Sequence, residues 1–214
     1  MTKKFVLSLS LFLAVSLMQS ATSRASTEAW DFSTAANAYT NGNWTFGEVF
    51  VPTQNIAVDF LGYYAAQGLG NFNSDHPVGM FDANGNLLAS TTIDNSSSFT
   101  TSSGHFAFNP IASITLLAGH TYVLEGVSNS DNYTWNDPDF TVYAPINILG
   151  NNWILGNGLN FNGTFLINDV TDGEWGANFG FTGVTSSTPE PGSLMLLSTG
   201  LLGVGGLLRR RLWA

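Results

Sequence analysis

Short runs of β-branched and aromatic residues, separated by Gly, Asn, Asp and Pro, fill the chain from residue 44 to residue 181. No helical period lies between these runs, and many short strands at this spacing predict an antiparallel sandwich or barrel. The predicted strands are 48–51, 56–64, 78–81, 87–93, 104–108, 111–117, 121–127, 140–143, 153–155, 164–167 and 175–181. We therefore expect an all-β body over residues 26–187: an antiparallel, jelly-roll-like β-sandwich with a short first strand or lead-in at 26–42.

Two local turn signals support this fold class. Asn84-Gly85 is a preferred pair for a tight hairpin turn, because both residues accept positive φ. Ala118-Gly119 predicts a second turn between two strands. The order Gly-x-Leu-Leu-Ala-Ser at 85–90, followed by Leu-Ala-Gly-x-Thr-Tyr-Val at 117–123, resembles a β-sandwich module of bacterial secreted proteins. That resemblance covers residues 56–127, and it implies a fold but no catalytic residues.

The N-terminus has the three parts of a secretory signal peptide. Lys3 and Lys4 form a basic start, and residues 5–18 are an uncharged apolar run of 14 residues. Small residues at 21 and 23, and at 23 and 25, then offer cleavage sites. The apolar run is short for a membrane span, so we expect residues 1–25 to be removed after Ser23 or Ala25.

The C-terminus contains a second apolar segment, with different flanks. No residue from Gly192 to Leu208 is charged, and 17 residues form a helix of about 26 Å. A hydrocarbon core of roughly 30 Å needs about 17–25 residues, so this segment can just span it. Arg209, Arg210 and Arg211 follow at once, and basic flanks stay on the cytoplasmic side. The body is then expected on the far side of the membrane.

Pro189, Glu190 and Pro191 precede this segment, and the two prolines can continue neither a helix nor a central strand. A Pro-Glu-Pro motif, an apolar helix and a terminal Arg cluster, in this order, resemble the PEP-CTERM sorting signal, here over residues 188–214. The resemblance implies a Gram-negative host that exports polysaccharide. It also implies cleavage near residues 189–191 by an exosortase, a membrane-embedded processing enzyme. The alternative is a plain C-terminal membrane anchor.

Charge excludes several classes of partner. All 15 acidic residues, but no Lys or Arg, lie between residues 25 and 208, so this stretch has a formal charge of −15. Nucleic acid is a very poor partner, because binding phosphate needs cations.

The chain has no cysteine, which excludes disulfides and a thiol nucleophile. Its 13% of aromatic residues argue against a disordered spacer.

The loop at 131–139 has the composition of a ligand site. Its candidate ligand-binding residues are Asp131, Tyr133, Trp135, Asp137 and Asp139. Carboxylate oxygens suit calcium, and Tyr and Trp faces can stack on sugar rings. The alternative is a solvated polar loop with an aromatic anchor. Asp82, Asn84 and Asn86 also alternate like a calcium loop, but the Gly and closing Glu are missing, so a hairpin turn is expected there.

No catalytic motif occurs in the chain. Gly-x-Ser-x-Gly, His-Glu-x-x-His and a P-loop are absent, and His76, His105 and His120 lack a metal-ligand spacing. A glycosidase would need two facing carboxyl groups, for which Glu48, Glu125 and Glu174 are the candidates. We expect no catalytic residues and no resident cofactor, with calcium as the one ion that the loop chemistry permits.

These observations leave three hypotheses. The first is an exported structural or adhesive protein of the cell surface or the exopolysaccharide matrix, processed by an exosortase and held briefly in the inner membrane. The second is a carbohydrate-binding module, calcium-dependent or not, that uses the loop at 131–139. The third is a polysaccharide hydrolase. The sequence favours the first, and the second is compatible with it.

Overall fold

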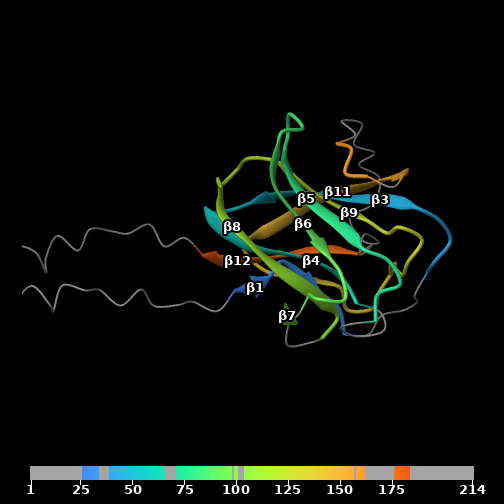
Figure 1. Cartoon of the computed structure of the whole chain (residues 1–214). Coiled ribbons are helices and arrows are strands. Elements are labelled where there is room, and N and C mark those ends of the chain that lie inside the picture. Colours follow the sequence, from blue (N-terminus) through green and yellow to red (C-terminus); the bar gives the residue numbers. More distant parts are fainter. Residues whose placement is uncertain are drawn as a thin grey trace, which may run out of the picture. The chain divides into compact units, whose positions relative to one another are not determined.

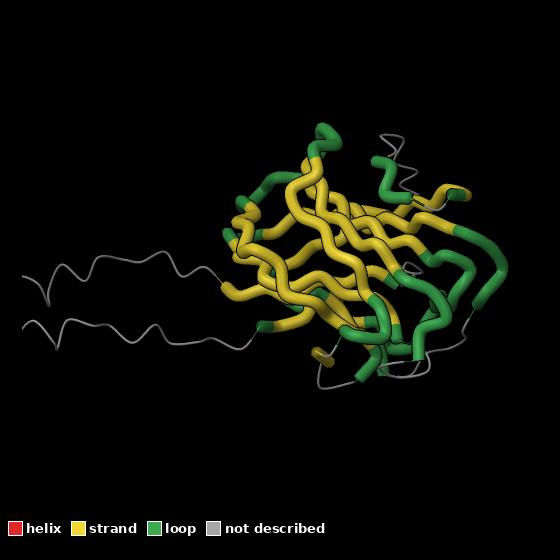
Figure 2. The backbone as a smooth tube through the Cα atoms, in the orientation of Figure 1, coloured by secondary structure: helices red, strands yellow, loops and turns green. Residues whose placement is uncertain are grey.

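The computed structural model describes residues 26–33, 39–65, 71–97, 99–100, 104–156, 158–161 and 176–183. The predicted signal peptide, the predicted sorting segment and the predicted strand at 164–167 lie outside these ranges. Within them no helix is long and apolar enough to cross a membrane. Figure 2 shows the described body as strands joined by loops and turns.

Two five-stranded antiparallel sheets form most of the body (Figure 1). The first sheet has the order β1 (Thr27–Glu28), β12 (Ala177–Gly183), β4 (Ile56–Tyr64), β8 (Phe106–Leu116) and β7 (Phe99–Thr100). The second has the order β11 (Ile146–Leu155), β3 (Trp44–Pro52), β9 (Tyr122–Val127), β5 (His76–Asp82) and β6 (Leu87–Ile93). A small ribbon pairs β10 (Thr141–Val142) with β2 (Trp30–Asp31). The all-β, antiparallel prediction is confirmed, and the finer jelly-roll connectivity stays a prediction.

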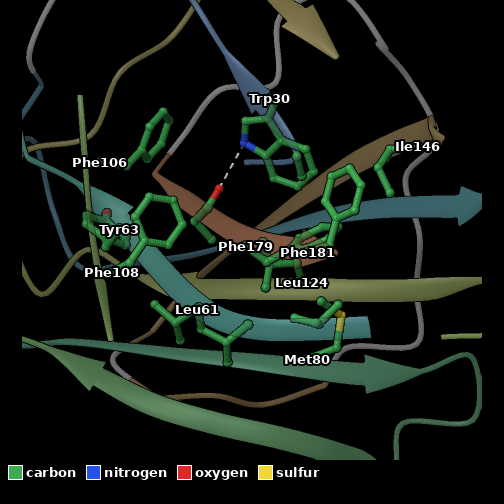
Figure 3. Close-up of a cluster of buried hydrophobic side chains, with 14 of the residues drawn as sticks. Trp30, Leu61, Tyr63, Met80, Phe106, Phe108, Leu124, Ile146, Phe179 and Phe181 are labelled. Carbon is green, nitrogen blue, oxygen red and sulfur yellow. Dashed lines mark hydrogen bonds between the residues drawn. The ribbon is translucent and has the colours of Figure 1, made fainter. Parts of the chain in front are cut away.

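The two sheets share one hydrophobic core (Figure 3). The first sheet contributes Leu61, Tyr63, Phe106, Phe108, Phe179 and Phe181, and the second contributes Phe50, Met80, Leu124 and Ile146. Phe50 of β3 stacks on Phe179 of β12 with ring centroids 5.0 Å apart. Aromatic rings therefore join the two layers directly, and they bury a large apolar area per residue.

The predicted lead-in is part of this core. Trp30 of β2 is fully buried, and its indole Nε1–H donates to the backbone oxygen of Ala177 at 3.1 Å. Asn178 Nδ2 in turn donates to the backbone oxygen of Trp30 at 2.8 Å. The first and last described segments of the body are thus held together by reciprocal hydrogen bonds.

Several strand boundaries agree with the sequence pattern, and one predicted break is wrong. β4 and β6 have the bounds predicted for residues 56–64 and 87–93. The predicted strands at 104–108 and 111–117 form one strand, β8, with Pro110 inside it. Proline lacks an N–H to donate to the ladder and is tolerated at edges and bulges. β7 pairs only with Phe108 and Ala107 of β8, and the β4 register shifts between Val58 and Phe60. The described strand pairing around Pro110 therefore tolerates a residue without a backbone N–H donor.

Both predicted turns are present, with different details. β5 and β6 form the expected hairpin, but of the pair Asn84-Gly85 only Gly85 has a positive φ, +84°. The loop is fixed instead by the Asp82 carboxylate, whose Oδ1 accepts the backbone N–H groups of Asn84 and Asn86 at 2.8 and 2.9 Å. The turn at Ala118-Gly119 leads from β8 to β9, which belong to different sheets.

Candidate functional site

The segment that contains the predicted loop has a constrained backbone. Among the described residues, every non-glycine residue with a positive φ lies here: Asn129, Ser130, Asn136 and Asp139, with φ between 47° and 62°. Such conformations are uncommon for residues with a side chain, although Asn and Asp tolerate them best. Surrounding contacts must therefore hold this loop in place.

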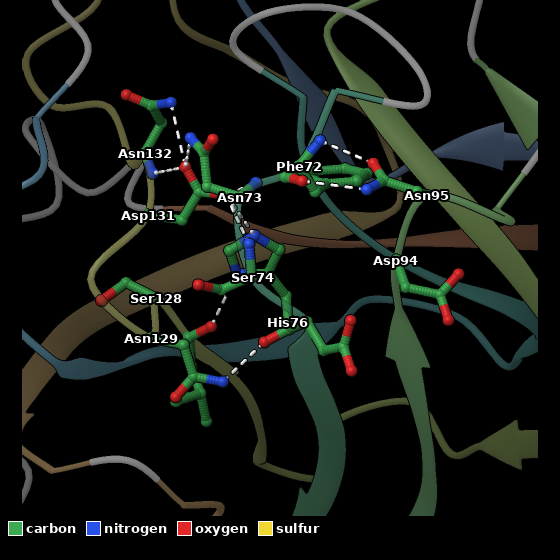
Figure 4. Close-up of polar contacts among 12 residues, drawn as sticks. Phe72, Asn73, Ser74, His76, Asp94, Asn95, Ser128, Asn129, Asp131 and Asn132 are labelled. Atoms are coloured by element: carbon green, nitrogen blue, oxygen red, sulfur yellow. Dashed lines mark hydrogen bonds and ion pairs between the residues drawn. The ribbon is translucent and has the colours of Figure 1, made fainter.

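Asp131 is the central acceptor of these contacts (Figure 4). Its side chain is 2% exposed. Its Oδ2 accepts the backbone N–H groups of Asn73 and Ser74 at 2.6 and 3.1 Å. Its Oδ1 accepts the backbone N–H of Asn132 at 2.7 Å and the Asn73 amide at 3.1 Å. The carboxylate thus ties the loop to the segment that leads into β5.

His76 lies beside this carboxylate and is fully buried. Its Nδ1–H donates to the backbone oxygen of Val127 at 3.0 Å, and its Nε2 lies 3.4 Å from Asp131 Oδ2. The ring stacks on Tyr63 with centroids 4.0 Å apart. Burial lowers the pKa of His76, and this outweighs the opposite effects of the Val127 carbonyl and of Asp131.

The pKa of the Asp131 carboxyl is also lowered, but for a different reason. Burial alone would raise the pKa of Asp131, but the hydrogen bonds from Asn73, Asn132 and Ser74 stabilise the anion and hold its pKa below the usual value of 3.8. The neutral imidazole and the ionised carboxylate are therefore the forms that the folded body favours near neutral pH.

We expect the free energy of unfolding to fall as the pH drops below about 6.5. Above that pH both states hold His76 neutral, whereas below it the unfolded chain binds a proton that the folded chain binds only at lower pH. The loss is at most about 1.4 kcal/mol per pH unit until the folded pKa is reached. Urea unfolding at several pH values between 7.5 and 5 measures it, above the range in which Asp131 titrates.

The control replaces His76 and His120 separately. His76→Gln lowers stability at every pH but flattens the slope between pH 6.5 and 5, whereas His120→Gln on the exposed turn keeps the wild-type slope. A wild-type slope in His76→Gln would assign the acid sensitivity to another group.

The other carboxylates of the predicted loop do not join Asp131. Asp137 is buried and accepts the Thr134 hydroxyl through both of its oxygens at 2.8 Å. Asp139 is exposed, and its Oδ2 accepts the Ser33 hydroxyl at 3.0 Å. Within the described ranges, no group of three or more His, Cys, Asp or Glu side chains is placed to hold a metal ion. The loop thus directs its carboxylates to three different structural contacts.

The two aromatic residues of the loop belong to a row of rings, which we call the aromatic row: Trp135, Tyr39, Tyr133, Phe46, Trp44 and Trp153. Successive centroids in this order are 6.4, 5.5, 4.6, 6.3 and 5.4 Å apart. Trp135 and Trp153, at the two ends, are 44% and 55% exposed. Tyr133 and Phe46, the two middle rings of the row, are buried.

Hydrogen bonds hold the aromatic row in place. Tyr39 and Tyr133 form an isolated β-bridge, each backbone N–H donating to the other's carbonyl at 2.9 and 3.0 Å. Asn41 Oδ1 accepts both the Tyr133 hydroxyl at 2.7 Å and the Trp44 indole N–H at 3.0 Å. The rings are therefore positioned before any ligand arrives, which lowers the entropic cost of binding.

The two described candidates for a hydrolase lie on opposite faces of the second sheet. Glu48 pairs with Leu124, a residue of the central core, whereas Glu125 pairs with Gly47 and alternates with Leu124 along β9. Successive side chains of a strand point to opposite faces. Both glutamates are buried, at 4% and 2% exposed, so they cannot flank one glycosidic bond as a pair. Glu174 lies outside the described residues.

Sequence reasoning identified Tyr133 and Trp135 but missed the rest of the row. Tyr39 and Trp44 lie close together early in the chain, far from Tyr133 and Trp153. Pairing between these segments brings them together: Tyr39 bridges Tyr133, and Trp153 lies opposite Phe46 in the ladder of β11 and β3. No local motif marks these residues. The exposed run of Trp153, Ile154 and Leu155 at the end of an edge strand is the one signal that a sequence pattern could have supplied.

Comparison with known proteins gives one match. The PEP-CTERM protein-sorting motif matches residues 187–211, which include Pro189, Glu190, Pro191 and the three terminal arginines. No curated protein matches the chain. The matched region covers the sorting segment.

The motif defines the class: exported proteins that carry a C-terminal sorting signal processed by an exosortase. Residues 187–211 carry the PEP-CTERM protein-sorting motif, as the Pro-Glu-Pro motif, the apolar segment and the Arg cluster predicted. The match includes Pro189, Glu190, Pro191 and Arg209–Arg211, and the sorting role of these individual residues stays a prediction. The binding role of the loop at 131–139 stays a prediction.

Proposed function

We propose that this exported protein is a structural or adhesive component of the cell surface or the exopolysaccharide matrix, and that its aromatic row holds neutral glycan. The observation that supports this is the row itself, with exposed Trp135 and Trp153 at its ends. Large exposed rings in a fixed arrangement offer apolar faces for sugar rings. A surface with no such task rarely exposes two tryptophans in one connected cluster.

The charge of the body supports a neutral ligand. No Lys or Arg lies between residues 25 and 208, so an acidic polysaccharide would meet only negative charge and neutral polar groups. Neutral sugar units avoid this repulsion. The sorting signal supports the location, because exosortase processing near residues 189–191 would release the body from the inner membrane on its outer side. The Gram-negative surface is part of this proposal.

Calcium is not needed in this binding mode. Asp131 and Asp137 already accept N–H and O–H donors within the fold, and no three His, Cys, Asp or Glu side chains among the described residues are placed to hold a metal ion. The aromatic row acts through ring faces, which require no metal. We therefore expect the affinity for glycan to be equal in calcium and in chelator.

The test is a glycan array with the full-length protein, followed by titration calorimetry on the best neutral oligosaccharide. We expect Trp135→Ala and Trp153→Ala each to weaken binding at least about tenfold, because truncating an interface tryptophan costs about 2 kcal/mol or more. Leu87→Ala is the matched control, since Leu87 is an equally exposed apolar residue on the opposite edge strand, β6. Unchanged affinity in both tryptophan variants would refute the aromatic row as the site.

A further inference from the structure

A cleft of about 430 Å³ opens beside the ribbon of β2 and β10. Its lining residues are Asp31, Phe32, Ser33, His105, Asp139, Thr141 and Tyr143. They come from three separate stretches of chain: the segment after Trp30, the residue before β8, and the end of the predicted loop with β10. The cleft shares no residue with the aromatic row, so it is a separate candidate site.

Two carboxylates from different stretches line this cleft, and each is held in position. Asp31 Oδ1 lies 2.8 Å from His105 Nδ1, and the two side chains are 11% and 24% exposed. Asp139 Oδ2 accepts the Ser33 hydroxyl at 3.0 Å. Thr141 lies opposite Asp31 in the β10–β2 ladder, so strand pairing places these two lining residues side by side. The cleft therefore presents fixed acceptors rather than flexible surface acids.

The carboxylates near Tyr143 make the interior of this cleft electronegative. The pKa of Tyr143 is raised, first by burial and then by the charges of Asp31 and Glu28, both of which oppose a second negative charge. The same potential favours a positive charge brought in by a ligand. The chain between residues 25 and 208 has no Lys or Arg to supply that charge from within.

The cleft also has aromatic walls. The His105 ring stacks on Phe32 with centroids 4.5 Å apart and an interplanar angle of 18°. The Tyr143 ring forms part of the lining. Aromatic faces attract cations electrostatically, and the attraction grows as the cation loses water. Carboxylates together with a tyrosine ring in one concave site suit a small organic cation better than a neutral sugar alone.

We propose that this cleft binds the primary ammonium group of a ligand, with Asp31 and Asp139 as its acceptors and Tyr143 beside it. An ammonium is a compact charge with three donors, which matches carboxylate and hydroxyl oxygens on facing walls. Two kinds of ligand carry this group to the cell surface: a polyamine and a de-N-acetylated amino sugar of a polysaccharide. The second would add a cationic contact to the neutral-glycan contact of the aromatic row.

The experiment is titration calorimetry of the full-length protein with three probes: spermidine, a glucosamine oligomer, and the matching N-acetylglucosamine oligomer. We expect binding of at least one of the two amine probes, weakened as salt rises, because charge–charge attraction is screened. The amine probe that binds more tightly identifies the source. If neither amine probe binds at millimolar concentration, the proposal is wrong.

Variants distinguish this cleft from the general negative charge of the body. We expect Asp139→Asn to weaken amine binding at least tenfold, whereas Asp75→Asn removes one exposed charge elsewhere and leaves the affinity unchanged. Equal losses in the two variants would overturn the site. Trp135→Ala should lower the affinity for neutral glycan and spare the affinity for spermidine. The failure of one proposal is therefore distinguishable from the failure of the other.

Discussion

Trp30→Ala is expected to lower the free energy of unfolding by about 3–5 kcal/mol, the range for removing a fully buried large aromatic side chain. The indole packs edge-on against Phe179 at 5.5 Å and Phe50 at 6.5 Å, so it contacts both sheets. Its loss also leaves the backbone oxygen of Ala177 without the indole donor. Natural domains have about 5–15 kcal/mol in total, so this single change threatens the fold. Urea unfolding followed by circular dichroism measures it.

Two further variants show whether the loss comes from this position. Trp30→Phe keeps an aromatic ring but not the N–H, and we expect a smaller loss of about 1–3 kcal/mol from the unpaired carbonyl and the lost volume. Trp153→Ala removes the same side chain where it is 55% exposed, and it should change stability by no more than about 0.5 kcal/mol. If Trp153→Ala were as costly as Trp30→Ala, the core would not be where the structure places it.

Trp30 also shows what a local sequence pattern cannot predict. β4 and β6 could be predicted to the residue because each is a run rich in apolar and β-branched residues between turn residues. Trp30 stands alone in a polar stretch, and its burial depends on a hydrogen bond to a partner 147 residues away. Pro110 is the opposite case, since its local preference suggests a break and the ladder around it permits a strand. Both differences are tertiary effects that override a local signal.

The influence of tertiary contacts also separates the two functional predictions, the sorting signal and the loop at 131–139. The sorting signal is contiguous, so its order and spacing are fully visible in the sequence, and the family match confirms it. The loop at 131–139 is a candidate site by its composition, but composition could not show which side chains point outward. Asp131 and Asp137 turn inward to hydrogen-bond donors, while Trp135 stays exposed and joins rings from distant strands. Which of these side chains is buried and which stays exposed depends on contacts with distant segments of the chain.

Asp131→Ala is expected to lower the free energy of unfolding by about 3–5 kcal/mol, as removal of one partner from a buried, hydrogen-bonded charge network does. The backbone N–H groups of Asn73, Ser74 and Asn132 lose an acceptor whose side chain is 2% exposed. Asp82→Ala is the matched control, because the Asp82 carboxylate also accepts two backbone N–H groups but at the exposed tip of a hairpin. There water can replace the lost acceptor, so stability should hardly change.

The outcome decides what Asp131 does in a loop whose composition suggested ligand binding. A structural acceptor predicts that Asp131→Ala lowers stability, while the fraction of protein that remains folded binds neutral glycan with an affinity close to wild type. A ligand-binding carboxylate predicts the reverse: wild-type stability and lost affinity. Urea unfolding and calorimetric titration on the same sample separate the two. The buried position of Asp131 and its five donors favour the first outcome, because a carboxylate already saturated by the fold has little capacity left for a ligand.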